Sequence, residues 1–362
     1  MIICIDCRMI NASGIGVYLR ECLPFLFESE HSFLLLGDKD TLARYKKEAS
    51  NAIVIICAIK PFSPHELIFF PKSILQKINT ADLFYSPFFN IPRGVTIPVF
   101  TTIHDIIFPD MPELTSKTGL AARMWFYRRA YKKSQKIFTV SEFSKSRIER
   151  HLGTEKPVIV TYSAIQPMFL AYRNSAGYVQ KKETIVFIGN IKKHKGLDCL
   201  IDAFILAKDE GLPHKLLIIG EKEKFRTTDN AIQRKIESIG SESVTFTGFI
   251  SDERLMEYLA EASLLVQPSL YEGFCLPPLE AMVLGTQVLI SDIPVLKEVY
   301  KDYPVTFFHA GDANDLKQKI VEQLFNRATE KFPLPDYLAQ EYTFEKTARI
   351  ILENAATMRA NK

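Results

Sequence analysis

A chain of 362 residues that is 47% hydrophobic and 24% charged has the composition of an ordinary globular protein and is long enough for two domains. Its formal net charge of +3 and the lack of a recognisable nucleic-acid-binding module argue against nucleic acid as a partner. No apolar run approaches the ~18 residues of a membrane-spanning helix and no signal peptide is evident, so we expect a cytoplasmic protein.

Six cysteines are compatible with reduced thiols in that compartment. Cys4 and Cys7, in the sequence CIDC, have the spacing of a redox or metal-binding pair. They lie in an apolar, strand-like run, however, where residues three apart point to opposite faces. We therefore interpret them as buried strand residues.

Expected strands alternate with expected helices along the whole chain. The first series of apolar, β-type runs covers residues 2–5, 33–36, 53–57, 83–85, 98–103, 137–140 and 158–162, with amphipathic helical segments between most of them, for example over 16–28. The second series covers 184–189, 215–220, 244–249, 263–269, 287–291 and 305–308. Strands that alternate with helices form parallel sheets, so the sequence predicts an α/β protein with two doubly wound parallel sheets.

The segment between the two series is polar and has no clear period. It reads QPMFLAYRNSAGYVQKKE and contains Pro167 and Gly177, which favours a linker. The predicted organisation is a first domain over 1–166, a linker over 167–182, a second domain over 183–340 and a terminal helix within 341–362. Ligands of open α/β sheets bind outside the carboxyl ends of the strands, so we expect the site in a cleft between the domains.

Two strand-end loops of the first domain carry candidate site residues. In NASGIGVYL, Gly14 and Gly16 bracket the start of an expected helix, where backbone amides can approach an anionic ligand. A tight turn without a ligand is an equally good interpretation. In TTIHDIIFPD, His104 and Asp105 follow a strand, which strengthens the case for catalysis or ligand contact, although a lone histidine is more often structural.

In the second domain, the sequence FIGNIKKHKG places a basic loop that ends at Lys195 between a strand and a helix, which suits a diphosphate. A solvated basic loop is the alternative. The stretch YEGFCLPPLE sets Glu272 in a turn after a strand and Glu280 in the following helix. A carboxylate at Glu280 can accept two hydrogen bonds from a ribose diol, and one at Glu272 can bind sugar hydroxyls or face positive charge on a sugar carbon. This arrangement is typical of a nucleotide-sugar site.

The segment VTFTGFISDERLMEYLAEASLLVQPSLYEGFCLPPLEAMVLGTQVLISDIPVLKEV resembles the donor half of the retaining GT-B glycosyltransferases of group 1, or GT4, and the resemblance spans nearly the whole chain. It implies two Rossmann-like domains and a terminal helix, YTFEKTARIILE, that crosses back to the first domain. By resemblance, Glu280 binds the ribose, Glu272 the transferred sugar and Lys195 the phosphate, while His104 lies near the reacting centre. The donor-binding residues implied are Gly14, Gly16, Asn190, Gly220, Phe249, Ile250, Gly273, Phe274, Cys275, Leu276 and Glu280, of which Phe274, Cys275 and Leu276 would offer backbone to the phosphate.

The chain departs from the family pattern at three places. Asn190 stands where many members have arginine, so Lys195, with Lys192 or Lys193, is expected to neutralise the diphosphate. Cys275 stands where glycine is usual, and Ser163-Ala164 replace the usual Asn-Gly.

The resemblance implies sugar transfer from a nucleoside-diphosphate sugar with retention, without a protein nucleophile, a cofactor or an essential metal. The GDKD sequence (Asp38, Asp40) matches the metal-binding motif of another glycosyltransferase fold, but Asp40 serves well as a helix N-cap there. Two other functions remain open, which are a nucleotide-sugar epimerase and a non-catalytic sugar-nucleotide-binding subunit.

A basic helix predicts where the acceptor comes from. In RMWFYRRAYKKSQKIF, helical spacing aligns one face that consists of Trp125, Arg128, Arg129, Lys132, Lys133 and Lys136, while Met124, Tyr127 and Tyr131 face inward. Such a face is attracted to anionic lipid. We therefore hypothesise peripheral binding to the inner face of the plasma membrane through Arg128, Arg129, Lys132 and Lys133, with a glycan or lipid-linked acceptor for envelope polysaccharide or lipopolysaccharide. A solvated basic helix is the alternative.

Overall fold

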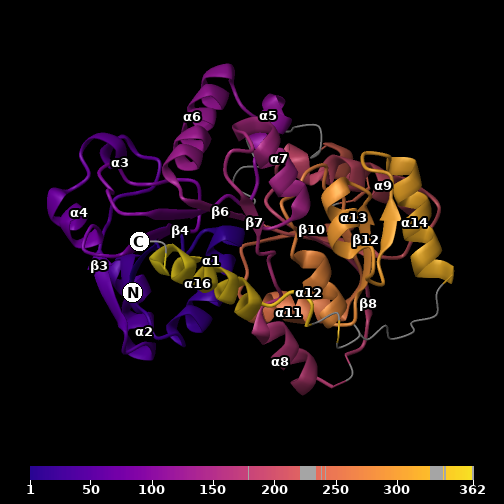
Figure 1. The fold of residues 1–362 in the computed structure, drawn as a ribbon. Coiled ribbons are helices and arrows are strands. Elements are labelled where there is room, and N and C mark those ends of the chain that lie inside the picture. Colours follow the sequence, from indigo (N-terminus) through magenta and orange to yellow (C-terminus); the bar gives the residue numbers. More distant parts are fainter. Residues whose placement is uncertain are drawn as a thin grey trace. The chain divides into compact units, whose positions relative to one another are not determined.

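The computed structural model describes residues 1–177, 179–220, 234–237, 239–240, 242–326, 337 and 340–360. The chain divides into two compact units (Figure 1). Unit 1 comprises Met1–Ala164 and Tyr342–Lys362, and unit 2 comprises Ile165–Glu341.

Unit 1 contains a seven-stranded sheet in the order β3-β2-β1-β4-β5-β6-β7, in which all neighbouring strands are parallel. The strands are β1 (Ile2–Asp6), β2 (Ser32–Gly37), β3 (Ala52–Ile56), β4 (Leu83–Ser86), β5 (Val99–Thr102), β6 (Lys136–Thr139) and β7 (Val158–Val160). The helices are α1 (Ser13–Phe27), α2 (Lys39–Glu48), α3 (Pro64–Ile68), α4 (Lys72–Ile78), α5 (Ile107–Asp110), α6 (Lys117–Lys133), α7 (Glu142–Leu152) and α16 (Phe344–Ala360), with a 3-10 turn at Pro112–Leu114.

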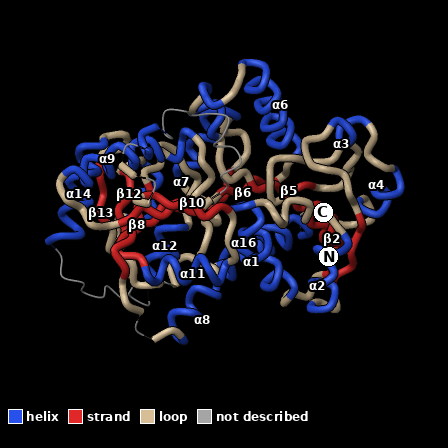
Figure 2. Tube along the Cα trace, turned by 180° about the vertical axis from the view of Figure 1, so that it is seen from behind, coloured by secondary structure: helices blue, strands red, loops and turns tan. Residues whose placement is uncertain are grey.

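Helices cover both faces of this sheet (Figure 2). On one face α16, although last in the chain, lies alongside α1, and the Thr347 hydroxyl donates a hydrogen bond of 2.8 Å to the Thr161 carbonyl. On the other face, α6 buries Tyr127, Ala130 and Tyr131. The terminal helix therefore packs as an integral part of unit 1.

Unit 2 contains a six-stranded parallel sheet in the order β10-β9-β8-β11-β12-β13. The strands are β8 (Lys182–Ile188), β9 (Lys215–Ile219), β10 (Val244–Gly248), β11 (Ala262–Gln267), β12 (Gln287–Ser291) and β13 (Thr306–Phe308). The helices are α8 (Pro167–Ser175), α9 (Leu197–Asp209), α11 (Asp252–Glu261), α12 (Pro277–Val283), α13 (Pro294–Tyr300) and α14 (Ala313–Asn326), with a 3-10 turn at Lys193–Lys195. Helices α9 and α14 pack side by side on one face, and α12 covers the other (Figure 2).

All the expected strands are present within a few residues of their predicted bounds, so the prediction of two doubly wound, Rossmann-like parallel sheets is confirmed. Their central strands are buried on both faces and read as continuous apolar runs. Cys4 and Cys7 are both buried, as expected, and burial raises their thiol pKa well above the usual value. Only Cys4 is a strand residue, because β1 ends at Asp6.

Two local expectations are wrong. Part of the predicted linker over 167–182 forms α8, which starts at Pro167, buries Phe169 and packs against α12. Proline is compatible with the first turn of a helix, where its missing N–H has no partner to lose. In GDKD, the N-cap of α2 is Asp38 and not Asp40, because the Asp38 carboxylate accepts from the backbone N–H groups of Asp40 and Thr41.

Candidate active site

The strand order of unit 2 places a topological switch point at the carboxyl ends of β8 and β11. The chain runs from β8 outward to β10, then returns to β11 and continues to β13 on the other side. The loops after β8 and β11 therefore leave the sheet in opposite directions, and this switch point is where ligands of open α/β sheets bind. The loop after β8 carries Lys195, and the loop after β11 carries Glu272.

Lys195 and Glu272 form an ion pair across this switch point. The Lys195 Nζ lies 2.7 Å from Glu272 Oε1, and the Ser269 hydroxyl donates to the same oxygen at 2.7 Å. Burial alone would raise the pKa of Glu272, but the charge and hydrogen bond of Lys195 and the hydrogen bond of Ser269 lower it below its usual value. Glu272 is therefore a carboxylate at neutral pH, although only 9% of the residue is exposed.

The two loops are held together by their backbones. The Leu270 N–H donates a hydrogen bond of 2.7 Å to the His194 carbonyl. Gly196, which has a φ of +69° and precedes α9, approaches Pro268 so closely that an added Cβ would lie 1.9 Å from its carbonyl oxygen. Only glycine fits this position, because the approach leaves no room for a side chain and the backbone is left-handed. Lys195 is thus fixed at the amino end of α9, where the helix dipole favours an anion.

Glu280 lies apart from that pair, on α12, and is 5% exposed. Among the described residues, the one hydrogen bond of its side-chain carboxylate comes from the Gln166 side chain, at 3.4 Å, and no cation pairs with it there. Burial, together with the distant charge of Asp252, raises the pKa of Glu280 to about 7, although the Gln166 hydrogen bond lowers it. A buried, poorly paired carboxylate with a displaced pKa is a functional-site candidate.

The predicted base-binding loops lie at the ends of β9 and β10. Gly220 and Gly248 form an antiparallel bridge, and an added Cβ on Gly220 would lie 2.1 Å from the Gly189 carbonyl oxygen. The Phe249 side chain that follows is 89% exposed. Asn190 and Ile250 are half-buried.

The predicted phosphate loop contains a strained residue. Cys275 has a φ of +75°, a left-handed conformation that a residue with a Cβ rarely adopts. It is buried, as is Phe274, and its carbonyl accepts a hydrogen bond from the Tyr300 hydroxyl. Gly273 and Leu276 are half-buried. Strain of this kind concentrates at functional sites.

His104 belongs to unit 1, just after β5. Its Nε2 lies 2.8 Å from the Pro87 carbonyl oxygen and its ring makes an edge contact with Tyr18 at 4.9 Å. Burial lowers the His104 pKa to about 4, although the Pro87 hydrogen bond opposes this shift, so the imidazole is neutral at pH 7. A carbonyl only accepts hydrogen bonds, so Nε2 carries the proton and Nδ1 has the lone pair.

The two glycines of the first loop have different surroundings. An added Cβ on Gly16 would lie 2.5 Å from the Ile10 carbonyl oxygen, so close packing requires this glycine. Nothing lies within 4 Å of the corresponding position on Gly14, which is exposed.

The cations on the basic face of α6 differ in their contacts. Arg128 and Lys132 are exposed, as is Trp125 at 50%. Arg129, in contrast, donates to the Ile91 carbonyl, and Lys133 donates to the Val95 carbonyl. Burial lowers the pKa of both cations. Arg129 and Lys133 therefore anchor the 91–95 segment in addition to facing solvent.

Several residues that contact or position the site glutamates were not predicted from the sequence. Gln166 donates to Glu280 and Ser269 donates to Glu272. Polar residues near a predicted linker or turn show no sequence pattern that would predict such contacts. Gly196 could have been predicted, because a glycine follows Lys195 at the start of an expected helix.

Among the described residues, no group of three or more His, Cys, Asp or Glu side chains could hold a metal ion, and no helix is both long and apolar enough to cross a membrane.

Two family models match the chain in succession. Residues 12–167 match the model described as Glycosyltransferase Family 4, and residues 169–334 match Glycosyl transferases group 1.

Among similar proteins, O-antigen chain mannosyltransferase B of Escherichia coli is 27% identical over 65% of this chain and 62% of its own length. The serotype-specific mannosyltransferase WbdA of Escherichia coli is 27% identical over 62% of this chain and 29% of its own length. The chain thus spans at most about three fifths of the length of these relatives.

Among solved structures, HepE of Anabaena in complex with UDP and glucose has a TM-score of 0.72 at 17% identity, and the match covers 99% of this chain and all of that one. Sucrose-phosphate synthase of Thermosynechococcus elongatus has the same TM-score and identity, with full coverage of both chains.

Proposed function

Because the chain belongs to the group 1 glycosyltransferases of the GT4 type, we propose that it transfers a sugar from a nucleoside-diphosphate sugar to a glycan or lipid-linked acceptor. The observation that carries this proposal is the Lys195–Glu272 pair at the switch point of the second sheet, with Glu280 buried on the next helix. A cation, a carboxylate beside it and a second buried carboxylate suit the phosphate, the sugar and the ribose respectively.

The charges account for how the sugar–phosphate bond breaks. Negative charge grows on the leaving diphosphate, and Lys195 with the first amides of α9 stabilises it. Cationic character grows on the anomeric carbon, and the carboxylate of Glu272 is available to face it. Lys195 is already paired in the free protein, so it exchanges or shares its contact with Glu272 when the donor arrives.

The transfer itself needs no covalent enzyme intermediate. In the retaining reaction that we propose, the bond between the anomeric carbon and the diphosphate oxygen breaks while the acceptor oxygen bonds to the same face. The acceptor proton passes to the leaving phosphate oxygen. In unit 1, neutral His104 has its Nδ1 lone pair available to accept a hydrogen bond from a sugar hydroxyl. Neither a metal nor a cofactor is required by this scheme.

Glu280 makes donor binding depend on pH. A ribose diol donates two hydrogen bonds to a carboxylate, so binding favours the ionised form. With a pKa of about 7 in the free protein, Glu280 must lose a proton to bind the diol at lower pH. Donor affinity therefore rises with pH and levels off above pH 7.

The first donors to test carry mannose, because two relatives are named mannosyltransferases, and glucose, because the HepE structure holds UDP and glucose. Each nucleotide sugar is incubated with the protein and candidate glycan acceptors, and the products are identified by mass spectrometry and NMR. Transfer with the anomeric configuration of the donor supports the proposal. A product of opposite configuration contradicts retention, an epimerised donor indicates an epimerase, and binding without any product indicates a non-catalytic subunit.

We further propose that the protein acts in envelope polysaccharide assembly at the inner face of the membrane. Exposed Arg128 and Lys132 next to the exposed Trp125 form a cationic surface with an aromatic edge. Anionic lipid attracts such a surface, and aromatic rings favour the headgroup region.

A further inference from the structure

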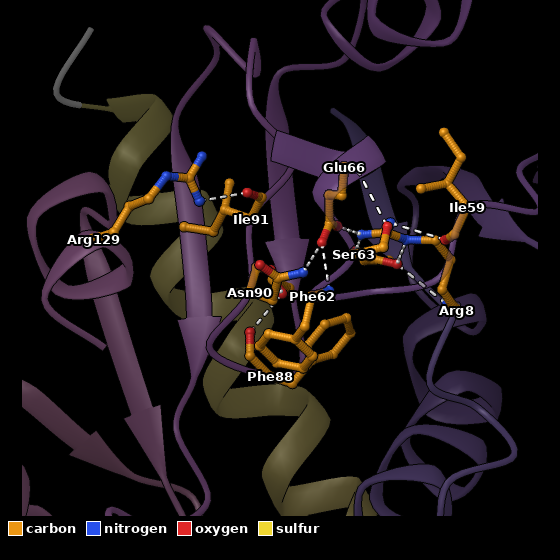
Figure 3. Close-up of polar contacts among 11 residues, drawn as sticks. Arg8, Ile59, Phe62, Ser63, Glu66, Phe88, Asn90, Ile91 and Arg129 are labelled. Atoms are coloured by element: carbon orange, nitrogen blue, oxygen red, sulfur yellow. Dashed lines mark hydrogen bonds and ion pairs between the residues drawn. The ribbon is translucent and has the colours of Figure 1, made fainter. Parts of the chain in front are cut away.

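The first sheet also has a switch point, between β1 and β4, and it holds a buried ionic cluster. Arg8, in the loop after β1, donates through Nε to Asp6 Oδ1 at 2.8 Å, and its Nη2 lies 2.6 Å from Glu66 Oε1. The exposed side-chain fractions are 2% for Arg8 and 0% for Asp6 and Glu66. Figure 3 shows Arg8 and Glu66 turned toward each other.

Burial of these ionic groups carries a desolvation cost that an apolar core would not have. Asp6, Arg8 and Glu66 are buried together, and well-packed apolar side chains often replace buried ion pairs without loss of stability. Burial alone would lower the pKa of Arg8, but Asp6 and Glu66 raise it well above its usual range, so the guanidinium stays charged. The buried ion pair is thus weak evidence that Glu66 serves stability alone.

The second oxygen of Glu66 reaches the neighbouring loops. Glu66 Oε2 accepts from the Phe62 N–H at 2.7 Å and from the Asn90 side-chain amide (Figure 3). Phe62 has a φ of +63°, a strained conformation that this hydrogen bond helps to fix. Asn90 lies in the loop after β4 and is fully buried. Glu66 thus ties the loops after β3 and β4 to Arg8.

The Ser86 side chain constrains the beginning of the loop after β4. The Ser86 hydroxyl lies 2.6 Å from the Phe88 carbonyl oxygen and 2.7 Å from the Asn90 carbonyl oxygen. Pro87 sits between these anchors, and its carbonyl oxygen contacts His104 Nε2 at 2.8 Å. The direction of this one carbonyl decides which nitrogen of the neutral imidazole carries the proton.

We propose that Glu66 is a positioning residue that, through Asn90 and Ser86, orients the Pro87 carbonyl and so selects the His104 tautomer with its lone pair on Nδ1. The inference rests on the proposed function for the catalytic use of that lone pair, but the tautomer itself is a property of the free protein. A glutamine at position 66 breaks the arrangement. Its single oxygen cannot accept from both Arg8 and Asn90, and its amide group turns a donor toward one of them.

The test is NMR of the full chain labelled with 15N-histidine. The signal of His104 among the seven histidines is identified by its loss in His104→Ala. We compare wild type with Glu66→Gln and with Ser86→Ala, a smaller change that keeps the ionic cluster. The control is Tyr131→Phe, which removes a hydroxyl that contacts the Gly153 carbonyl at 2.9 Å, away from this loop.

We expect protonated Nε2 in wild type and in Tyr131→Phe, and the Nδ1-protonated tautomer to appear in Glu66→Gln and Ser86→Ala. Turnover of transfer should fall about tenfold in those two variants, with the KM for the donor unchanged. An unchanged His104 tautomer in folded Glu66→Gln and Ser86→Ala overturns the inference. A tautomer change in a protein that shows no transfer upholds the positioning role and counts against the proposed function instead.

Discussion

At the level of single residues, the buried carboxylate of Glu280 makes both donor affinity and the free energy of unfolding depend on pH. Its pKa rises from the usual value near 4.5 to about 7 in the folded protein, so folding takes up a proton between these pH values. The free energy of unfolding therefore falls as pH increases from about 4.5 to about 7, and the loss is complete above pH 7. A shift of this size corresponds to about 3 kcal/mol.

We predict that Glu280→Gln stabilises the protein at pH 8 by up to about 3 kcal/mol, because glutamine keeps the shape without the buried charge. Near pH 5 the variant and wild type should unfold alike. Chemical denaturation at both pH values measures the difference. An equal effect at pH 5 and pH 8 would mean that Glu280 does not titrate in this range.

Substitution of Cys275 tests whether the predicted phosphate loop is strained. Cys275→Gly and Cys275→Ala both remove the thiol, but only alanine keeps a Cβ at a φ of +75°. We predict that the glycine variant is more stable than the alanine variant by about 1 kcal/mol, the reverse of the usual order. Thermal unfolding of the two variants decides the sign. A more stable alanine variant would show that the loop adopts an ordinary conformation.

At the scale of elements, the sequence predicted the strands well because each central strand is a continuous apolar run. It failed at α8, where a short helix starts with proline in a polar segment, and at the N-cap of α2, where two aspartates compete within three residues. It gave no hint of the Arg8–Glu66 cluster, because these residues come from separate loops and show no local pattern. Lys195 and Glu272 were both predicted, but their direct ion pair was not, since only the tertiary fold brings them together.

The contact between the loops after β8 and β11 depends on Gly196. We predict that Gly196→Ala destabilises the protein by about 3 kcal/mol or more, because the new Cβ forces the two loops apart. Binding of the nucleotide sugar should weaken as well, since Lys195 and Glu272 separate.

Gly285→Ala is the matched control. Gly285 has a φ of +73° but nothing lies within 4 Å of an added Cβ. Its substitution should cost only the backbone strain, about 1 to 2 kcal/mol, and leave donor binding intact. Calorimetric unfolding and nucleotide titration of both variants make the comparison. Equal behaviour of the two would refute the close approach of Gly196 to Pro268.

At the scale of the whole molecule, the fold class could be predicted from the alternation of strands and helices, whereas the exact surface could not. The α6 face illustrates this, because helical spacing aligned five cations. Lys136 belongs to β6 instead, and the contacts of Arg129 and Lys133 with backbone carbonyls depend on a distant loop. Arg128 and Lys132 are thus the cations to change when membrane binding is tested.

We predict that replacing Arg128 and Lys132 with serine weakens binding to anionic vesicles about thirtyfold at low salt, given about 1 kcal/mol for each charge. Lys46 and Lys47, exposed on α2, provide a control with the same loss of charge in the same unit. Trp125 is the single tryptophan of the chain, so a blue shift of its emission reports contact at this surface. Equal binding to neutral and anionic vesicles would favour a soluble acceptor.

Lys195, Glu272 and Glu280 together make up the proposed nucleotide-sugar site of unit 2. The most direct measurement is calorimetric titration of UDP and GDP sugars into wild type, Glu280→Ala and Lys195→Ala, followed by turnover with the donor that binds. The control is Glu322→Ala on α14, a glutamate whose side chain is 42% exposed and pairs with Lys319. We predict that Glu280→Ala loses donor affinity about tenfold or more, that Lys195→Ala mainly loses turnover, and that Glu322→Ala matches wild type. Unchanged affinity and turnover in both site variants would contradict the claim.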